Sequence, residues 1–408
     1  MELRMNKKVL TLTAVCIIGS YVDLAHAHHN PSQYNKSQTG ENRSYTIAGS
    51  KNFYNFQSDL RKDQAVTKDI KNTKTTGLRG YLLYEDGKIV IDESIELPDF
   101  IKRNGNRLPS HSIGKSLVSY VTGHAICEGY IDSVDVKLDD WPTIKNTLYE
   151  GQSLIDLLNM TAGDENYTGA RFGKKDNRIK INGVIKNVNT VPLYKVMKGA
   201  TQLHTKRTTS WFSETPIYNY NALVTNTIMN YVIYKTGDDW EPLLHKVFTQ
   251  HVKVKDEVHF LKIKNKARYS TQSNLPKTGL GTKELGRYSF YATRYDYLRI
   301  AKTMMDDWNN DTCAGKYLKA MYKQRIDKQH KNSGWARDNG YRSWYSKSYG
   351  GQFHFDLVGL TNRKILSMVG FAGQNIHIDF DAKRIIVINT SDNHINWLGY
   401  AHNHLKKK

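Results

Sequence analysis

Strand-forming residues are concentrated in two distant parts of this sequence, and this constrains the fold more than any other feature. Residues 77–94 read GLRGYLLYEDGKIVIDES, where Asp86 and Gly87 predict a tight turn between two apolar strands. Further strand-like segments lie near the end of the chain, at 350–360, 364–380 and 384–391. Strands at both ends with helices between them favour one antiparallel sheet, built from both chain ends and flanked by helices. We therefore predict an α+β fold.

Helical patterns occupy the middle of the chain. Residues 112–128 place apolar side chains on one helical face, and Gly129 ends the pattern. Further helices are expected over three interior segments and one closing segment: 153–163, 221–237, 295–308 and 395–405. The stretch from about 240 to 290 is charged and irregular. This order predicts a mainly helical insert between the two parts of the sheet.

The first residues have the composition of a targeting signal. A basic start precedes the apolar run 9–19, and the small residues Ala25 and Ala27 flank a histidine in the position that a signal peptidase reads. The run is too short to span a membrane as an ordinary helix. We predict a secretory signal over 1–27 that is cleaved after Ala27, and hence a periplasmic or secreted protein. Residues 28–75 are predicted to be a polar leader with a short helical or irregular segment.

Charge and cysteine content limit the partners and the compartment without deciding them. The formal net charge is +20, but the lysines are scattered, and no basic stripe or nucleic-acid motif is present. We expect a solvated basic surface and no nucleic-acid partner. Removal of the signal would leave Cys127 and Cys313, which either pair in an oxidising compartment or stay unpaired.

The segment HSIGKS at 111–116 contains a pair with catalytic chemistry. Ser112 and Lys115 are spaced so that one helical turn stacks their side chains. A buried lysine with a lowered pKa can remove the proton of a serine hydroxyl, and a helix N-terminus offers free N–H groups to a developing oxyanion. On its own this four-residue spacing is a weak signal, because serine and lysine are common at helix starts.

Two longer segments strengthen the interpretation. PSHSIGKSLVSYVTGHAICEGYI, beginning at Pro109, and SLIDLLNMTAGD, beginning at Ser153, resemble serine β-lactamase-like hydrolases. The resemblance is to the branch that holds class C β-lactamases, D-amino-acid peptidases, esterases and 6-aminohexanoate-dimer hydrolases. It implies a β-lactamase/transpeptidase-like domain over 76–408. Its α/β part would comprise 76–145 and 285–408, and its mainly helical part 146–284.

The family's second element is a tyrosine that is followed two residues later by Asn or Ser. The resemblance places it at Tyr220, which would partner Lys115 in proton transfer. Tyr218 remains an alternative that would otherwise line the substrate site. Ala222 departs from the expected Asn or Ser, so the amide that would hold a substrate carbonyl is missing.

The family's third element is a strand that completes the oxyanion hole. A literal Lys-Thr-Gly occurs at 277–279, but it lies in a Pro/Gly-rich loop with no strand pattern after it. The segment GFAGQ fits better, and the resemblance implies that the N–H groups of Ser112 and Ala372 hold the oxyanion. Its other members are expected to contact substrate: Gly370, Phe371, Gly373 and Gln374. The similar YGGQFHFD at 349–356 is predicted to be a preceding strand.

Two further residues are candidates for substrate contact. His111 either tunes the nucleophile, lines the cleft entrance or caps the helix, and Asp164 could meet a substrate amine. The histidines, among them His124, His354 and His377, show no HExxH motif or paired ligand spacing. We therefore expect no metal and no cofactor.

The resemblance implies an exported serine hydrolase that cleaves an amide or ester through a Ser112 acyl-enzyme, most like 6-aminohexanoate-oligomer hydrolases and related esterases. One alternative is a catalytically weak or silent member that binds cell-wall or amide-oligomer ligands. Another is a β-lactamase or D-amino-acid carboxypeptidase. The expected partner is a small amide or ester substrate, with no membrane span after signal cleavage. The oligomeric state is not predicted.

Overall fold

The computed structural model describes most of the chain after residue 43. The described residues are 44–142, 144, 149–162, 178–181, 184–187, 218, 220–262, 286–328, 345–391 and 397–405. The predicted signal over 1–27, Asp164 and the Lys-Thr-Gly at 277–279 lie outside them.

A nine-stranded sheet dominates the fold and joins the two ends of the chain. Its order is β10-β11-β12-β13-β14-β15-β3-β4-β2, and all its pairs are antiparallel except β2 with β4. Strand β15, from the end of the chain, pairs with β3, from its start, as the prediction of one sheet from both chain ends requires. The strands are β2 (Gln57–Ser58), β3 (Leu78–Glu85), β4 (Lys88–Ser94), β10 (Ile326–Asp327), β11 (Ser346–Gly350), β12 (Phe353–Leu357), β13 (Ile365–Val369), β14 (Asn375–Asp379) and β15 (Arg384–Thr390).

The turn between β3 and β4 has the predicted form. Asp86 and Gly87 have φ values of 49° and 85°, so both adopt the left-handed region that a two-residue hairpin turn needs. Asp and Gly tolerate this region better than branched residues do. The hairpin predicted over 77–94 is therefore confirmed.

A second, four-stranded sheet was not predicted. Its order is β1-β8-β9-β5, with bounds Ser44–Ile47, Val258–Lys262, Gly286–Ala292 and Leu108–Pro109. Strand β1 belongs to the stretch expected to be a polar leader, where the buried Tyr45 and Ile47 alternate with polar residues. An alternation over four residues is too short to stand out from a polar sequence. A separate hairpin pairs β6 (Arg178–Ile181) with β7 (Val184–Asn187).

The predicted helices appear in the predicted order, and their bounds differ from the predicted ones by one or more residues. Segments 112–128, 221–237 and 295–308 become α5, α8 and α10, whereas 153–163 becomes the five-residue α6. The α-helices are α2 (Gln64–Lys71), α3 (Thr73–Thr76), α4 (Asp99–Lys102), α5 (Ile113–Cys127), α6 (Leu154–Leu158), α8 (Ala222–Thr236), α9 (Trp240–Leu244), α10 (Arg294–Asn309), α11 (Cys313–Lys323) and α13 (Trp397–Leu405). The described residues also form short 3₁₀-helices, η3 (Leu138–Asp140), η5 (Gly237–Asp239) and η9 (Phe371–Gly373), and the π-helix η6 (His245–His251).

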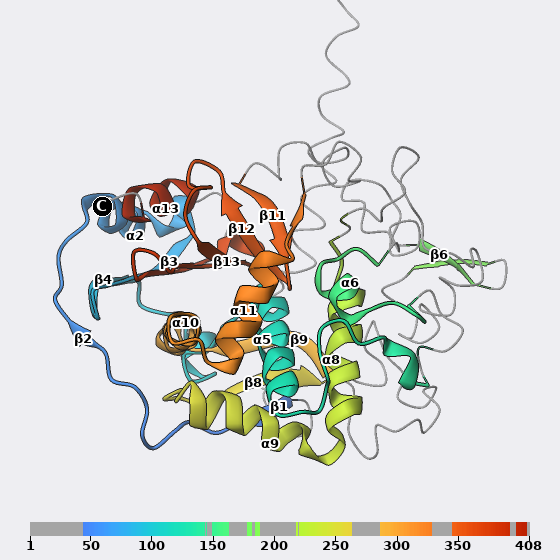
Figure 1. Ribbon diagram of the computed structural model, residues 1–408. Coiled ribbons are helices and arrows are strands. Elements are labelled where there is room, and N and C mark those ends of the chain that lie inside the picture. The colour runs from blue at the N-terminus through green and yellow to red at the C-terminus, as the bar shows by residue number, and fades with distance from the viewer. Residues whose placement is uncertain are drawn as a thin grey trace, which may run out of the picture.

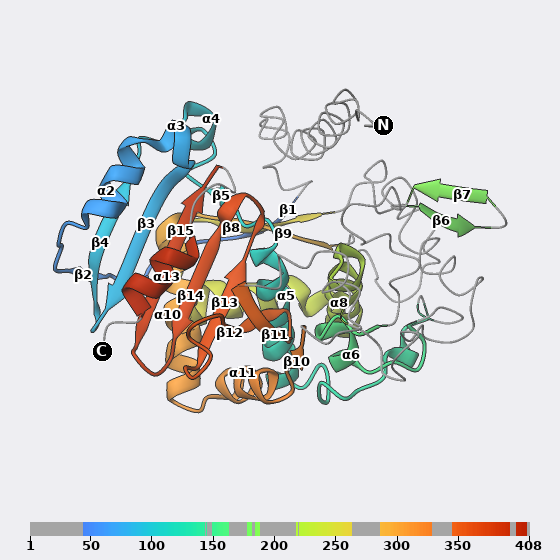
Figure 2. The same cartoon turned by 90° about the horizontal axis from the view of Figure 1, so that it is seen from above.

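The nine-stranded sheet is covered on both faces. Alternate residues of β3 point to opposite sides, so Tyr81 and Leu83 join one apolar cluster and Leu82 and Tyr84 join the other. Helices α2 and α13 cover the first face, and α10 and α11 cover the second (Figure 1). Helix α5 lies between this sheet and α8 (Figure 2). The core around α5 is therefore the centre of the molecule.

One covalent bond reinforces this centre. Cys127, at the end of α5, forms a disulfide with Cys313, at the start of α11, with their Cα atoms 5.8 Å apart. Of the two states that the sequence left open, the bonded state is the one present. Among the helices in the described part of the chain, none is long and apolar enough to cross a membrane.

Candidate active site

The turn before α5 is held in place by the second sheet. The N–H of Ser110 donates to Phe290 O at 2.8 Å, and Phe290 N–H donates back to Ser110 Oγ at 3.0 Å. His111 follows with a φ of 48°, a left-handed conformation that a non-glycine residue rarely adopts. Ser112 then forms the N-cap of α5 and is partly exposed. Its backbone N–H donates to no acceptor in the described residues, which leaves it available to a ligand.

Gly114 allows α5 to approach the second sheet closely. A Cβ at this position would lie 1.9 Å from Tyr288 O and 2.8 Å from Ser110 Oγ. No side chain larger than hydrogen fits there without moving the helix from β9. This glycine, inside HSIGKS, therefore sets the distance between the start of α5 and strand β9, and the sequence patterns had indicated no role for it.

Lys115 is buried beside Ser112. Its Nζ donates to Ser112 Oγ at 3.1 Å, and only 2% of the residue is exposed. The rings of Tyr288 and Tyr220 lie 4.0 and 4.7 Å from the ammonium nitrogen. Burial lowers the pKa of Lys115 from its ordinary value; the nearby Tyr220 acts in the opposite direction, and Arg287 reinforces the lowering. Lowering this pKa enlarges the neutral fraction that can accept a proton.

Of the two candidate tyrosines, Tyr220 is the one that lies against Lys115. Tyr218 is 2% exposed and packs its ring on Tyr349 at 5.1 Å. Burial raises the pKa of Tyr218 well above its ordinary value, so its hydroxyl stays protonated. The geometry therefore favours Tyr220 over Tyr218 as the partner of the lysine.

The residues after Tyr220 begin α8. Asn221 is its N-cap, and the Asn221 side chain accepts a hydrogen bond from Val224 N–H at 2.9 Å. Ala222 is the first helical residue and offers only a methyl group. The amide next to Tyr220 is thus used for capping. Ala222, at the position where the family's Asn or Ser was expected, supplies no polar group.

The segment GFAGQ lies against the turn that precedes α5. A Cβ on Gly370 would lie 2.7 Å from Ser110 O, and the Phe371 ring meets the His111 ring edge-on with centroids 5.8 Å apart. Ala372 has a φ of 59° and is buried within η9. The structure thus brings together the two segments that were predicted to form the oxyanion hole.

Gln374 is engaged inside the sheet. Its Nε2 donates to Thr390 O, and its Oε1 accepts a hydrogen bond from Asn389 Nδ2 at 3.0 Å. Only 3% of Gln374 is exposed. Both polar atoms hold β15 in place, a different use from the substrate contact that the sequence suggested.

The similar segment YGGQFHFD was predicted to be one preceding strand, but it forms the end of β11, a turn and most of β12. Its Gln352 is a structural junction: Oε1 accepts from Thr225 Oγ1 at 2.7 Å, and Nε2 donates to Leu158 O at 2.9 Å. Its backbone oxygen accepts from Ser116 Oγ at 2.7 Å. Gln352 therefore fixes α5, α6 and α8 relative to the sheet, a role that no local pattern indicated.

A second buried serine–lysine pair lies further along the sheet. Lys328 Nζ donates to Ser346 Oγ at 2.5 Å and lies 3.3 Å from His354 Nδ1. Burial lowers the pKa of Lys328 to about 7. The His354 ring lies 6.4 Å from that of Tyr220, so the two clusters are neighbours. No local pattern indicated this pair, because Lys328 directly follows β10 and Ser346 begins β11, eighteen residues later.

Comparison with known proteins rests on structure. No protein-family model matches the sequence. No curated protein matches it either. A provisionally assigned 6-aminohexanoate-dimer hydrolase from Bacillus anthracis aligns with a TM-score of 0.58 at 14% identity, covering 89% of this chain and 91% of that one.

Two other solved structures agree with this match. A penicillin-binding protein from Bacillus halodurans has a TM-score of 0.53 at 12% identity, over 85% of this chain and all 100% of that one. A class C β-lactamase from Rhodobacter sphaeroides has a TM-score of 0.51 at 12% identity, over 84% and 99% of the chains. The protein therefore has the fold of serine β-lactamases and penicillin-binding proteins, as the resemblance implied.

Proposed function

We propose that the protein is a serine hydrolase that cleaves an amide or ester bond through an acyl-enzyme at Ser112. The observation that carries this proposal is the contact of 3.1 Å between the buried Lys115 Nζ and Ser112 Oγ at the start of α5. The fold, which is shared with serine β-lactamases and penicillin-binding proteins, supports it.

In the proposed reaction, neutral Lys115 accepts the proton of the Ser112 hydroxyl as Oγ attacks the substrate carbonyl carbon. Tyr220, beside the lysine, assists the transfer and passes the proton to the leaving nitrogen or oxygen. The N–H groups of Ser112 and Ala372 stabilise the oxyanion. Water then attacks the acyl-enzyme and gives a proton to the Lys115–Tyr220 pair. The pair returns a proton to Ser112 Oγ as its bond to the acyl carbon breaks and the acid leaves.

We infer that the substrate is a linear amide or ester whose binding does not require a lysine in the segment beside Ser112. The segment 370–374, which lies beside the turn that precedes α5, contains no lysine that could bind a substrate carboxylate. Structural similarity to a provisionally assigned 6-aminohexanoate-dimer hydrolase supports linear amides. A β-lactamase or D-amino-acid carboxypeptidase activity is the alternative within the same chemistry.

A second candidate function is binding without turnover. It is favoured by Ala222, whose methyl group leaves no amide beside Tyr220 to hold a substrate carbonyl. In that case the site would bind cell-wall or amide-oligomer ligands and release them unchanged.

We also propose that the mature protein works outside the cytoplasm. The disulfide between Cys127 and Cys313 supports this, because such bonds persist in oxidising compartments. The signal predicted over 1–27 supports it independently.

A substrate panel with one matched variant tests the proposal. The panel contains 6-aminohexanoate oligomers, short p-nitrophenyl esters, D-Ala-D-Ala peptides and nitrocefin, with Ser112→Ala as the variant. We expect turnover of an oligomer or ester by the wild type and its loss in the variant. Equal hydrolysis by both would overturn the role of Ser112, and binding without hydrolysis by the wild type would favour the second candidate.

A further inference from the structure

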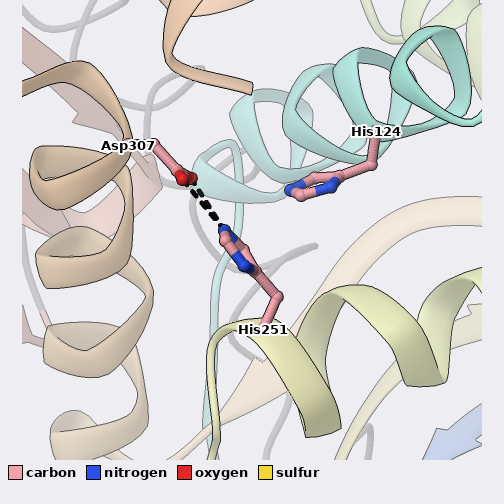
Figure 3. A group of neighbouring side chains, drawn as sticks. All are labelled: His124, His251 and Asp307. Atoms are coloured by element: carbon pink, nitrogen blue, oxygen red, sulfur yellow. Dashed lines mark hydrogen bonds and ion pairs between the residues drawn. The ribbon is translucent and has the colours of Figure 1, made fainter. Parts of the chain in front are cut away.

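Three side chains meet at the end of α5 that lies away from Ser112. His124 comes from the last turn of α5, His251 ends the π-helix η6, and Asp307 lies near the end of α10. Figure 3 shows the three converging from these separate elements. One nitrogen or oxygen atom from each lies within 4.8 Å of the other two. The arrangement matches the ligand set of a divalent transition metal.

His124 contributes an independent indication of a ligand. The residue is only 9% exposed, and its Nε2 has no hydrogen-bond partner among the described residues. A buried polar atom without a partner is destabilising, and native structures seldom contain one. A bound cation would use the Nε2 lone pair and remove this cost.

Asp307 is already oriented for such a role. Tyr120 donates its hydroxyl to Asp307 Oδ2 at 2.5 Å, and Thr312 Oγ1 donates to Oδ1 at 2.8 Å. His251 Nε2 lies 3.0 Å from both carboxylate oxygens. Hydrogen bonds of this kind hold a ligating carboxylate in one orientation and tune its basicity.

The disulfide lies close to the cluster along the chain. Cys127 is one helical turn beyond His124, and Cys313 directly follows Thr312, the residue that orients Asp307. The bond therefore limits how far two of the three ligand-bearing elements can separate. Such a restraint prepares a site before the ion arrives.

We propose that His124, His251 and Asp307 bind one divalent transition-metal ion, Zn²⁺ above all. Two imidazoles and one carboxylate are ligands that zinc prefers, whereas calcium and magnesium prefer oxygen ligands alone. Bonds of about 2.0–2.2 Å at tetrahedral angles place ligand atoms about 3.3–3.6 Å apart. The pair of His251 and Asp307 is near that separation, so binding requires chiefly a closer approach of His124.

Three protein ligands leave a fourth position for water. The His251 side chain is 37% exposed, so the ion has a path from solvent. Ser112 precedes His124 by twelve residues of helix, about 18 Å at 1.5 Å per residue. We therefore assign the ion a stabilising role that joins α5, η6 and α10, independent of the proposed hydrolysis.

The test uses the full mature chain, stripped of metal with a chelator and titrated with Zn²⁺. We expect one tight zinc equivalent per chain by calorimetry and elemental analysis, and a melting temperature that rises with zinc. His251→Ala removes an accessible ligand and should weaken binding by more than about tenfold. His245→Ala, on the same π-helix but outside the cluster, is the matched control and should bind like the wild type.

Asp307→Asn provides a second test that keeps the shape of the side chain. It should also lower zinc affinity, and in both ligand variants added zinc should no longer raise the melting temperature. The proposal is overturned if the wild type takes up no stoichiometric zinc, or if His251→Ala binds as tightly as His245→Ala. Because the readouts are metal content and stability, they hold whether or not the protein hydrolyses anything.

Discussion

Two buried serine–lysine pairs lie in neighbouring parts of this fold, and they differ in what surrounds them. In the first pair Lys115 Nζ is 3.1 Å from Ser112 Oγ; in the second Lys328 Nζ is 2.5 Å from Ser346 Oγ. Burial lowers the pKa of both lysines. Judged by distance and charge alone, the second pair is at least as well prepared for catalysis.

Access and backbone geometry separate the two pairs. Ser112 is partly exposed at a helix N-terminus, and its N–H has no acceptor in the part of the chain that the structure describes. Ser346, in contrast, is fully buried in β11 opposite Leu357 of β12. A substrate carbonyl needs both a path to the hydroxyl and donors for its oxyanion. A short contact to a lysine of lowered pKa is therefore not a sufficient criterion, and the position of Ser112 at the helix start is the reason that we propose it as the nucleophile.

Replacing each lysine in turn should produce the largest difference in activity between the two pairs. Lys115→Met should lower kcat/KM by about 10⁴-fold, the upper range for loss of a general base. Lys328→Met should change it by less than about tenfold, because the proposed reaction does not use the second pair. Ester hydrolysis by the two purified variants gives the answer. A larger loss in Lys328→Met would assign the reaction to the second pair.

Replacing the two tyrosines near the first pair should also lower kcat unequally. Tyr220→Phe removes the hydroxyl that assists Lys115 and should cost about 10²-fold in kcat. Tyr218→Phe should leave kcat within a few-fold, since that ring packs on Tyr349. Stopped-flow measurement of acylation with a p-nitrophenyl ester tests both. If Tyr218→Phe is the slower variant, Tyr218 is the proton carrier and our assignment is wrong.

The first pair depends on a close approach of helix and strand, which a methyl group should disturb. Gly114→Ala places a Cβ 1.9 Å from Tyr288 O and should lower the free energy of unfolding by about 3 kcal/mol. Gly80→Ala is the control, because the nearest atom to its Cβ lies at 3.6 Å. Urea denaturation followed by circular dichroism measures both. A Gly114→Ala variant as stable as Gly80→Ala would mean that α5 shifts without cost.

The second pair should affect the pH dependence of the free energy of unfolding rather than the rate of hydrolysis. The pKa of Lys328 is about 7 in the folded protein and near its ordinary value of 10.5 when unfolded. Between these values the unfolded chain binds more protons, so this residue makes stability rise with pH, by up to about 1.4 kcal/mol per unit. Burying the charged Lys328 therefore lowers the free energy of unfolding most at about pH 7 and below, and this cost shrinks as pH rises towards 10.5.

Lys328→Met removes this dependence. The variant should exceed the wild type in stability near pH 7, and the difference should shrink towards pH 9. Unfolding free energies at pH 7, 8 and 9 test this. Parallel curves for the two proteins would show that Lys328 is uncharged or unperturbed in both states. Lys115 contributes a slope of the same sign, so some dependence should remain in the variant.

The first pair could be found from sequence because it is local. Ser112 and Lys115 lie one helical turn apart, and the helix they begin has a clear apolar period and a glycine stop at Gly129. The same holds for the hairpin at 77–94 and the strands near the end of the chain. Local spacing determines these features, so a single sequence reveals them.

The remaining features depend on contacts between distant segments. Strand β1 pairs with β8, more than 200 residues later, and each is too short to show a period. Lys328 and Ser346 come from different parts of the sheet edge, and the cluster of His124, His251 and Asp307 joins three elements. A search for ligand spacing along the chain cannot detect such groups, because only the tertiary fold brings them together.

Mass mapping of an activity-probe adduct tests the central claim most directly. The mature protein is mixed with a fluorophosphonate, digested and analysed by peptide mass spectrometry. We predict one covalent adduct on Ser112 and none on Ser346, with no adduct at all in Ser112→Ala. An adduct on Ser346, or none on Ser112, would contradict the account.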